Sequence, residues 1–354
     1  MTSLGRRAVL AAILAAGLLA AGLTAGLAGL AAGAGTPGTP VRTAAPAARA
    51  QRVPARPARR VVYPASFAGS AMTGGRQGLQ VFAARSGRLL RPVTTVKSAS
   101  GPEVAGHPRQ LYYLTDGTGP NCSTIMRFRY GGGQPRVLRR FVNISVAAFT
   151  VSRDGRMLAY VWSPQGSAAP GFRCDVTSPA NLTVQNLRTG ARHTLRGVPG
   201  GVSGLAWSPR DRRLAVDVTG GPLDISQVRV LAQPLTAARY DPGRPLRCPA
   251  AGRSCAEFTP QFTTAGAVAF TACLQLSART CRYVLARAGG SRTVVLARLG
   301  RGLARTQDGA WSAVDPAGSA AIVTTPLGAR FATYRWVRGH GVVRLHRPVN
   351  GVSW

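Results

Sequence analysis

The fold is decided by residues 146–161, which have the sequence VAAFTVSRDGRMLAYV. Apolar segments flank the polar group SRDG on both sides, and this pattern predicts a strand, a tight turn and a second strand. Asp154 and Gly155 suit the turn, because a two-residue hairpin loop needs positive backbone φ angles that Gly and Asp tolerate. Asp154 is therefore interpreted as a structural turn residue.

The same pattern recurs along the chain with a period of about 50 residues, which is typical of repeat architectures. Residues 202–216 have the sequence VSGLAWSPRDRRLAV, and weaker copies occupy residues 258–270 and 310–323. A second hairpin follows each copy and is clearest at residues 182–195, LTVQNLRTGARHTL. Two hairpins in each unit predict four antiparallel strands and therefore a propeller blade.

Six of these outer hairpins predict six blades; they occupy residues 79–90, 125–138, 182–195, 228–235, 283–296 and 331–345. The chain ends with VNGVSW at residues 349–354, which matches the blade-opening strand VSGLAW and then stops. We expect this C-terminal strand to complete the N-terminal blade, because closing the ring hides the edge strands. The predicted fold class is all-β, a single β-propeller of six four-stranded blades closed by the C-terminal strand.

The repeat resembles that of the WD40-like propellers of the TolB type. Residues 152–159, SRDGRMLA, and residues 208–215, SPRDRRLA, look like that family's S-P-D-G-x-x-L-A repeat. The resemblance covers the chain from about residue 75 to its end, and it implies a fold and no particular activity, because propellers host many functions. We expect no amino-terminal TolB-like domain, so the translocation role of that protein does not carry over.

The first 34 residues predict export. Arg6 and Arg7 precede an uncharged stretch at residues 8–34, which is rich in Ala and Gly. A basic start before an apolar run is typical of a signal peptide. The run is also long enough to anchor the chain in a membrane. The protein is therefore expected in the cell envelope or the extracellular space, either secreted or anchored through residues 8–34.

Three parts are predicted along the chain: a signal peptide or membrane anchor at residues 1–34, a linker at residues 35–60 and the propeller at residues 61–354. The linker is rich in Pro, Ala and Arg, contains no acid and has almost no large apolar residue, so it cannot bury a core. We expect it to be extended and basic.

The chain is strongly basic, with a formal net charge of +34. Such a field attracts polyanions. The arginine excess also fits the codon bias of a GC-rich genome, because Lys97 is the only lysine and Ala and Gly are abundant. The propeller lacks the Lys/Arg block of a nucleic-acid arm, so the expected partner is a protein, a peptide or an anionic envelope polymer rather than nucleic acid.

Signatures of catalysis and metal binding are absent from the sequence. It contains no G-x-S-x-G nucleophile elbow, its four histidines are scattered, and its cysteines form no C-x-x-C pair. No catalytic residue, cofactor or metal site is predicted, and the favoured function is a binding module. The alternative is a glycosidase- or lyase-like enzyme whose acid and base are assembled from several blades.

Six cysteines behind an export signal predict disulfides. Pairing of neighbours gives Cys122–Cys174, Cys248–Cys255 and Cys273–Cys281, although fifteen connectivities are open. In the predicted blades, these residues all fall in connections from a second to a third strand, or from a fourth strand to the next first strand. Both kinds of connection emerge on the same face of a propeller.

This face also carries the long loops at residues 163–180 and 237–256. Binding residues concentrate in loops that a rigid scaffold holds, so the disulfide-stapled face is predicted to bind the ligand. Substitutions in the opposite turns, such as at Thr189, are expected to leave binding intact. The alternative is that the stapled loops are solvated and that the disulfides only resist proteolysis. The candidate ligand-binding residues are Asp116, Arg173, Asp175, Asp217, Asp224 and Arg253.

Overall fold

A computed structural model describes residues 66–73, 76–83, 86, 88–95, 104–107, 110–116, 122–129, 133–164, 180–198, 201–220, 225–241, 243–249, 255–277, 280–303, 310–327, 330–346 and 349–353. The predicted leader and linker lie outside these residues. Within them the chain forms β-strands, and none of the described segments is an apolar helix of a length that could cross a membrane.

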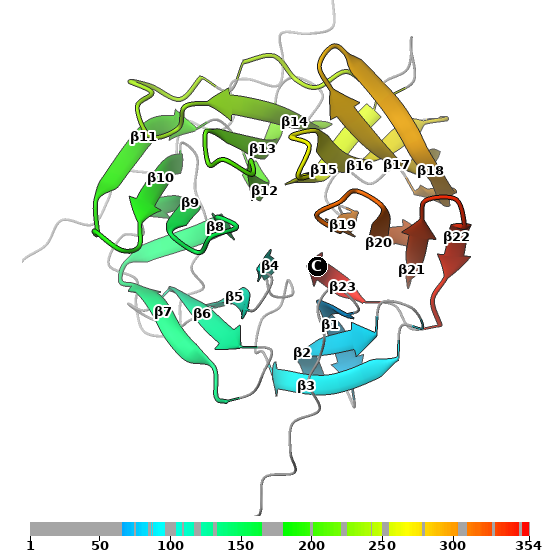
Figure 1. Cartoon of the computed structure of the whole chain (residues 1–354), viewed down its shortest axis with the longest axis horizontal. Helices are drawn as coiled ribbons and strands as arrows, with labels where there is room; N and C mark the ends of the chain where they lie inside the picture. The colour runs from blue at the N-terminus through cyan, green and yellow to red at the C-terminus, as the bar shows by residue number, and fades with distance from the viewer. Residues whose placement is uncertain are drawn as a thin grey trace, which may run out of the picture. The chain divides into compact units, whose positions relative to one another are not determined.

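The strands form six antiparallel sheets, which we number as blades in chain order (Figure 1). Blade 1 contains β23 (Asn350–Ser353), β1 (Ser66–Thr73), β2 (Arg76–Ala83) and β3 (Leu89–Thr95). Blade 2 contains β4 (Val104–His107), β5 (Gln110–Asp116), β6 (Ser123–Arg129) and β7 (Arg136–Phe141). Blade 3 contains β8 (Ile144–Val151), β9 (Met157–Pro164), β10 (Ala180–Asn186) and β11 (Arg192–Val198).

The second half of the chain forms the other three sheets. Blade 4 contains β12 (Gly201–Trp207), β13 (Arg213–Gly220) and β14 (Ile225–Ala232). Blade 5 contains β15 (Cys255–Phe262), β16 (Val268–Gln275), β17 (Thr280–Gly289) and β18 (Arg292–Leu303). Blade 6 contains β19 (Trp311–Val314), β20 (Ala320–Leu327), β21 (Arg330–Val337) and β22 (Gly341–Arg344).

The C-terminal strand lies in the N-terminal sheet, as the sequence predicted. Strand β23 pairs antiparallel with β1, with Ser353 opposite Ala68 and Asn350 opposite Ser70. The first strand of each blade contacts the first strand of the next, in the order β4, β8, β12, β15, β19, β23 and back to β4. The six blades of the all-β propeller therefore follow one another around a common centre (Figure 1).

The prediction of four strands in every blade is wrong for blade 4, which has three. The outer hairpin expected at residues 228–235 does not form, because the chain after β14 contains Pro234, Pro245 and Pro249. Proline has no backbone N–H and cannot continue a ladder of strand hydrogen bonds, so the pairing with β14 is limited to an isolated bridge between Arg229 and Pro245. The segment still touches the blade edge, where the Leu246 N–H donates to the Val228 carbonyl at 2.8 Å.

The turn of the repeat is longer than the two residues expected. The Ser152 N–H donates to the Met157 carbonyl at 2.8 Å, so four residues lie between the paired ends. Within this loop the Gly155 N–H donates to the Ser152 carbonyl at 2.9 Å, and Gly155 has a φ of 74°. Asp211 occupies the corresponding position of blade 4 with a φ of 54°. The positive φ predicted for the turn is therefore confirmed, in a larger loop.

The core consists of apolar layers between neighbouring blades. Leu182 and Val184 of blade 3, for example, share one cluster with Leu214 and Val216 of blade 4. The middle strands are buried on both faces, as in β9, whereas the outermost strands β7 and β11 expose much of their length. Polar side chains that could meet a ligand are thus confined to the turns, the outermost strands and the spaces between blade edges.

Candidate functional site

An open cleft of about 390 Å³ lies between blades 2 and 3 on the face that carries the hairpin turns. This volume falls within the range of about 300–1,000 Å³ that is usual for small-ligand sites. Strands β5, β6 and β7 contribute one wall, and the other wall comes from β10 and from the turns of blade 3. The lining residues are Tyr112, Arg127, Leu138, Arg139, Gly155, Arg156, Gln185, Leu187 and Arg188.

Four arginines from four separate elements converge on this arginine cleft. Arg127 belongs to β6 and Arg139 to β7, while Arg156 and Arg188 lie in the turns of the two hairpins of blade 3. None of the described residues that line the cleft is acidic. Because a guanidinium stays protonated at any physiological pH, the cleft carries a permanent positive charge.

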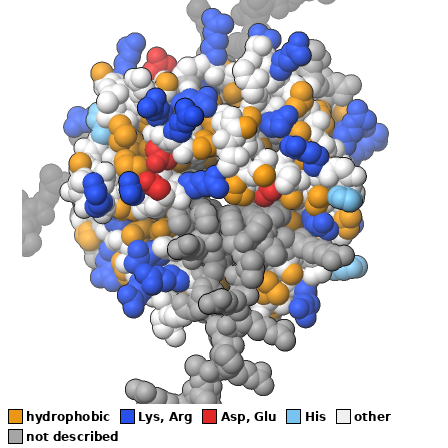
Figure 2. All heavy atoms as spheres, viewed as in Figure 1, with side chains coloured by type: hydrophobic (Ala, Val, Ile, Leu, Met, Phe, Trp, Pro, Cys, Tyr) orange, Lys and Arg blue, Asp and Glu red, His pale blue; other side chains and the backbone are white. Residues whose placement is uncertain are grey.

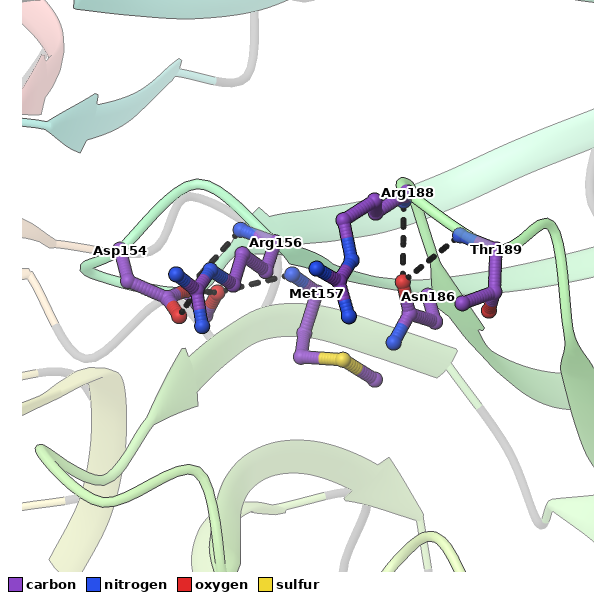
Figure 3. Close-up of polar contacts among 7 residues, drawn as sticks. Asp154, Arg156, Met157, Asn186, Arg188 and Thr189 are labelled. Atoms are coloured by element: carbon purple, nitrogen blue, oxygen red, sulfur yellow. Dashed lines mark hydrogen bonds and ion pairs between the residues drawn. The ribbon is translucent and has the colours of Figure 1, made fainter.

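Asp154 positions Arg156 at the mouth of the cleft (Figure 3). The Asp154 carboxylate accepts hydrogen bonds from the Ser152 hydroxyl at 2.6 Å and from the Arg156 N–H at 2.9 Å. Partial burial raises the pKa of Asp154, but these hydrogen bonds and the charge of Arg156 outweigh burial and lower the pKa below its usual value. The structural role predicted for Asp154 is confirmed.

The ion pair at this turn does not neutralise the cleft. Asp154 Oδ2 lies 3.4 Å from Arg156 Nε, and the two side chains are 45% and 68% exposed respectively. An exposed pair of this kind contributes about 0–1 kcal/mol, because water screens both charges. The carboxylate therefore orients Arg156 while leaving its guanidinium open to solvent and to a ligand.

Asn186 positions Arg188 in the same way at the outer hairpin of blade 3. Its side-chain oxygen accepts hydrogen bonds from the Arg188 N–H at 2.9 Å and the Thr189 N–H at 3.1 Å, and Gly190 follows with a φ of 77°. Asn side chains commonly close turns by such bonds. In Figure 3 the Arg188 side chain extends from its own turn toward the turn that carries Arg156.

Arg139 is partly buried, as Arg127 is, whereas Arg156 and Arg188 are exposed. The Arg139 guanidinium donates to the Gln185 side-chain oxygen and lies 5.1 Å from the Phe141 ring centroid and 5.5 Å from that of Tyr160. Its Nε is buried and has no hydrogen-bond partner. Burial lowers the pKa of Arg139, Tyr160 opposes this shift, and Arg192 adds to it by charge repulsion. Arg139 is thus a cation held by neutral groups, without a carboxylate counter-charge.

These groups can bind an anion, and they include no pair suited to acid–base catalysis. Guanidinium groups donate paired hydrogen bonds to carboxylate, sulfate or phosphate oxygens. Leu138 and Leu187 add apolar surface beside them. The cleft therefore has the composition of a recognition site.

The candidate ligand-binding residues predicted from the sequence lie in different places, and some of them lie outside the described residues. Arg173, Asp175, Asp224 and Arg253 lie outside the described residues, so their assignment stays a prediction. Asp116 is the last residue of β5. Asp217 lies within β13 and is completely buried, so it presents no surface to a ligand.

Asp217 is held by groups of two blades. The Ser203 hydroxyl donates to its carboxylate at 2.9 Å, the Thr259 N–H of blade 5 donates at 3.2 Å, and the Ser226 hydroxyl also donates. Burial raises the pKa of Asp217 to about 6, although these hydrogen bonds oppose the shift. Asp217 therefore joins blades 4 and 5 from the inside.

Glu257 is a second buried acid beside Asp217. It is 2% exposed, and its carboxylate accepts a hydrogen bond from the Val228 N–H at 2.9 Å. Burial raises the pKa of Glu257 to about 8; the bond from Val228 opposes the shift, and the charge of Asp217 adds to it. Glu257 thus satisfies a backbone group at the edge where blade 4 lacks its fourth strand. Since both acids are enclosed by protein, they do not form the open acid–base pair that an enzyme of the alternative class requires.

Two predicted disulfides are confirmed, Cys248–Cys255 and Cys273–Cys281. The first joins the irregular segment after β14 to the start of β15, and the second joins β16 to β17. Cys122 is also disulfide-bonded. Cys174, the partner expected for it, lies outside the described residues.

Sequence reasoning missed the arginine cleft because it assigned no binding role to the hairpin turns. Arg188 sits in the turn NLRTG and Arg156 follows Asp154-Gly155, and both were interpreted only as parts of turns. The available signal was the recurrence of arginine at turns and along β6 and β7. That signal becomes a site only when the contact between blades 2 and 3 is known.

Comparison with known proteins identifies the architecture. TolB from Acinetobacter baumannii superposes on this chain with a TM-score of 0.58 at 13% sequence identity, over 83% of this chain and 67% of that one. This chain has the TolB-type β-propeller fold. No family model matches the sequence, and no curated protein matches it either.

Two other solved structures resemble this TolB-type propeller less well. A functionally unknown protein from Desulfotomaculum acetoxidans has a TM-score of 0.43 at 12% identity, over 76% of this chain and 75% of that one. A prolyl endopeptidase has a TM-score of 0.41 at 14% identity, over 70% of this chain and 37% of that one. The fold assignment rests on the comparison with TolB from Acinetobacter baumannii, and function has to be argued from the site.

Proposed function

We propose that this TolB-type propeller is an exported binding module of the cell envelope or extracellular space, which recognises an anionic glycan or polymer and performs no chemistry. The observation that carries the proposal is the excess of exposed arginine over exposed acid. Figure 2 shows blue basic side chains spread over one face, with few red acidic ones. Among the described residues whose exposure is known, Asp154 and Asp241 are the exposed acids.

The exposed arginines form a rim on the outermost strands of four blades. We call them the rim arginines: Arg136 and Arg140 on β7, Arg192 and Arg196 on β11, Arg292, Arg298 and Arg301 on β18, and Arg344 on β22. A surface of one charge sign attracts polyanions over a distance of about 10 Å at moderate salt. Codon bias explains arginine in place of lysine, but it does not explain why acids are so rare at the surface.

Export is supported by the disulfides and by the basic, apolar start of the sequence. Disulfides persist in oxidising compartments outside the cytosol, and Cys248–Cys255 and Cys273–Cys281 are both paired. An envelope location would also bring the protein close to anionic polymers.

A second candidate function is recognition of a protein or peptide by the disulfide-stapled face. It is favoured by the position of both described disulfides at connections of that face. Its candidate residues Arg173, Asp175, Asp224 and Arg253 remain predictions. Charge-removing substitutions at these four positions would weaken capture of a protein partner without unfolding the chain, if this candidate is correct.

Retention on immobilised polymers tests the proposed function. The purified protein is applied to matrices that carry dextran sulfate, polyphosphate or neutral dextran, and it is eluted with a gradient from about 0.05 to 0.5 M NaCl. We expect retention on both anionic matrices and none on neutral dextran, with the binding constant falling as a power of the salt concentration. Failure to bind either anionic matrix at low salt would reject the proposal.

A further inference from the structure

We infer that the arginine cleft between blades 2 and 3 is a binding site for a phosphate ester group, carried by a sugar or another polyol. This inference rests on the proposed function, because it names the chemical group of the anionic ligand. It differs from that function in location, since the rim arginines alone would hold any polyanion without a defined pocket.

The charge of the cleft favours phosphate over a single carboxylate. Arg127, Arg139, Arg156 and Arg188 line it, and Asp154 is the acid beside it. Asp154 contributes one negative charge against the four arginines, so the cleft keeps a net positive charge. A phosphate monoester carries a charge of about −1.5 to −2 at neutral pH and has three strong acceptor oxygens. It can therefore bond to several guanidinium groups at once, whereas one carboxylate offers two oxygens and one charge.

Arg139 supplies the strongest reason for an anion in this place. Its partners are the Gln185 amide and the rings of Phe141 and Tyr160, all of them neutral, and its Nε has no partner. A half-buried cation without a counter-charge is unfavourable, because partial burial removes water that would stabilise it. A phosphate group bound in the cleft would provide the missing counter-charge.

The remaining walls suit the carbon skeleton of a polyol. Leu138 and Leu187 offer partly exposed apolar side chains, and the Tyr112 hydroxyl donates to the Gln110 side-chain oxygen at 3.0 Å. Burial raises the pKa of Tyr112, so its phenol stays uncharged and does not repel an anion. A cleft of about 390 Å³ is larger than an inorganic phosphate ion needs, which leaves room for the group attached to it.

Calorimetric titration with defined small molecules tests the inference. The ligands are glucose 6-phosphate, inorganic phosphate, glucuronate and glucose, which separate the ester, the bare oxyanion, the carboxylate and the uncharged skeleton. The cleft variant is Arg127→Gln/Arg188→Gln, because both side chains line the cleft and neither forms a hydrogen bond or ion pair with another described residue. The control variant is Arg292→Gln/Arg298→Gln, which removes the same charge from exposed positions on β18.

We expect the wild-type protein to bind glucose 6-phosphate more tightly than phosphate or glucuronate, and glucose not at all. The cleft variant should lose about tenfold or more in affinity for glucose 6-phosphate, because two charge-assisted contacts disappear. The control variant should stay within about twofold, since screened charges on another blade act weakly. Unchanged melting curves would show that both variants are folded.

Two results would overturn the inference: equal affinity of wild type and cleft variant for glucose 6-phosphate, or tighter binding of glucuronate than of the phosphate ester. Its failure is distinguishable from failure of the proposed function. If the protein is retained on anionic matrices but the cleft variant binds glucose 6-phosphate normally, only the cleft assignment falls. If the cleft binds glucose 6-phosphate but no anionic matrix retains the protein, only the proposed polymer recognition falls.

Discussion

Blades 3 and 4 both begin with the repeat that defines the fold, at residues 146–161 and 202–216, but they use their polar residues in opposite ways. Blade 3 is a regular sheet of four strands, and its turns place Arg156 and Arg188 at an open cleft. Blade 4 has three strands, and it is linked to blade 5 by the buried acids Asp217 and Glu257 and by the Cys248–Cys255 disulfide.

The inner hairpin of the repeat is specified by local sequence, whereas the outer part is not. The inner hairpin needs only its turn residues, and it forms in both blades. The outer part can be lost when internal polar contacts and a covalent link replace the missing strand pairing. Blade 3, whose four strands pair regularly, presents Arg156 and Arg188 to the cleft instead.

The largest expected effect comes from removing the buried support of blade 4. Asp217→Ala leaves the hydroxyls of Ser203 and Ser226 and the Thr259 N–H without their acceptor. We expect the free energy of unfolding to fall by about 3–5 kcal/mol, because one buried hydrogen bond and two partly buried ones are lost together. Urea denaturation measures the change. The matched control is Asp241→Ala, an exposed aspartate after β14, which should cost less than about 1 kcal/mol. Equal effects of the two substitutions would mean that the buried acid does not support the blade.

The pH dependence of stability should also reflect the acids of blade 4. The pKa of Glu257 is raised to about 8 and that of Asp217 to about 6, so the folded protein holds protons that the unfolded chain releases near pH 4. The free energy of unfolding should therefore fall as the pH rises from about 4 to 8, by up to about 1.4 kcal/mol per pH unit for each group. Denaturation series at pH 5, 6, 7 and 8 measure this slope.

Glu257→Gln is the matched variant for the pH experiment, because it retains an oxygen that can accept from the Val228 N–H. It should remove most of the slope above about pH 6, where Asp217 has already titrated. If the slope between pH 6 and 8 were the same in this variant as in wild type, Glu257 would not be the group that titrates.

Much of blade 3 was predictable from the sequence, and much of blade 4 was not. The motif SRDG predicts the inner hairpin because its contacts are local, within residues 152–157. The match of residues 349–354 to a blade-opening strand likewise predicts the pairing of β23 with β1. The loss of a strand in blade 4 depends on prolines after β14, which were present in the sequence but were outweighed by the expectation of a regular repeat.

The arginine cleft could not be predicted from the sequence for a different reason. Arg127 and Arg188 are 61 residues apart in the sequence, and they share a site only because blades 2 and 3 lie against each other. The partner of Glu257 is equally non-local, since its carboxylate reaches a backbone N–H of the preceding blade. Cysteine pairs were predictable because each described pair is close in sequence.

Breaking the disulfide of blade 4 should have a smaller effect than removing Asp217. Cys248→Ser/Cys255→Ser opens a loop whose ends are seven residues apart. The chain-entropy model gives a loss of about 2–3 kcal/mol for so short a loop. Urea denaturation of the double variant and of wild type, both in non-reducing buffer so that Cys273–Cys281 stays intact, measures this loss. A loss below about 0.5 kcal/mol would show that the irregular segment is held without the disulfide.

Substituting the positive-φ turn residue of blade 3 or of blade 4 should change the free energy of unfolding least, and in opposite directions. Gly155→Ala forces a side chain into a φ of 74° and should cost about 1 kcal/mol. Asp211→Gly should stabilise by about 0.5–1 kcal/mol, because it relieves a φ of 54° and removes a carboxylate oxygen that is buried without a partner. Burial also raises the pKa of Asp211 to about 6, with Asp154 adding to the shift. Thermal unfolding measures both, and a destabilising Asp211→Gly would contradict this view of the turn.

The most direct test of the central claim compares the turn arginines of these two blades in their affinity for glucose 6-phosphate. Arg156→Gln/Arg188→Gln removes two charges from the turns of blade 3, and Arg210→Gln/Arg212→Gln removes two exposed charges from the corresponding face of blade 4. Net charge is identical in the two variants, so any difference must come from position. We predict that the blade 3 variant loses about tenfold or more in affinity, whereas the blade 4 variant stays within about twofold of wild type. Equal losses of affinity in the two variants would contradict the claim that the arginine cleft between blades 2 and 3 forms the site.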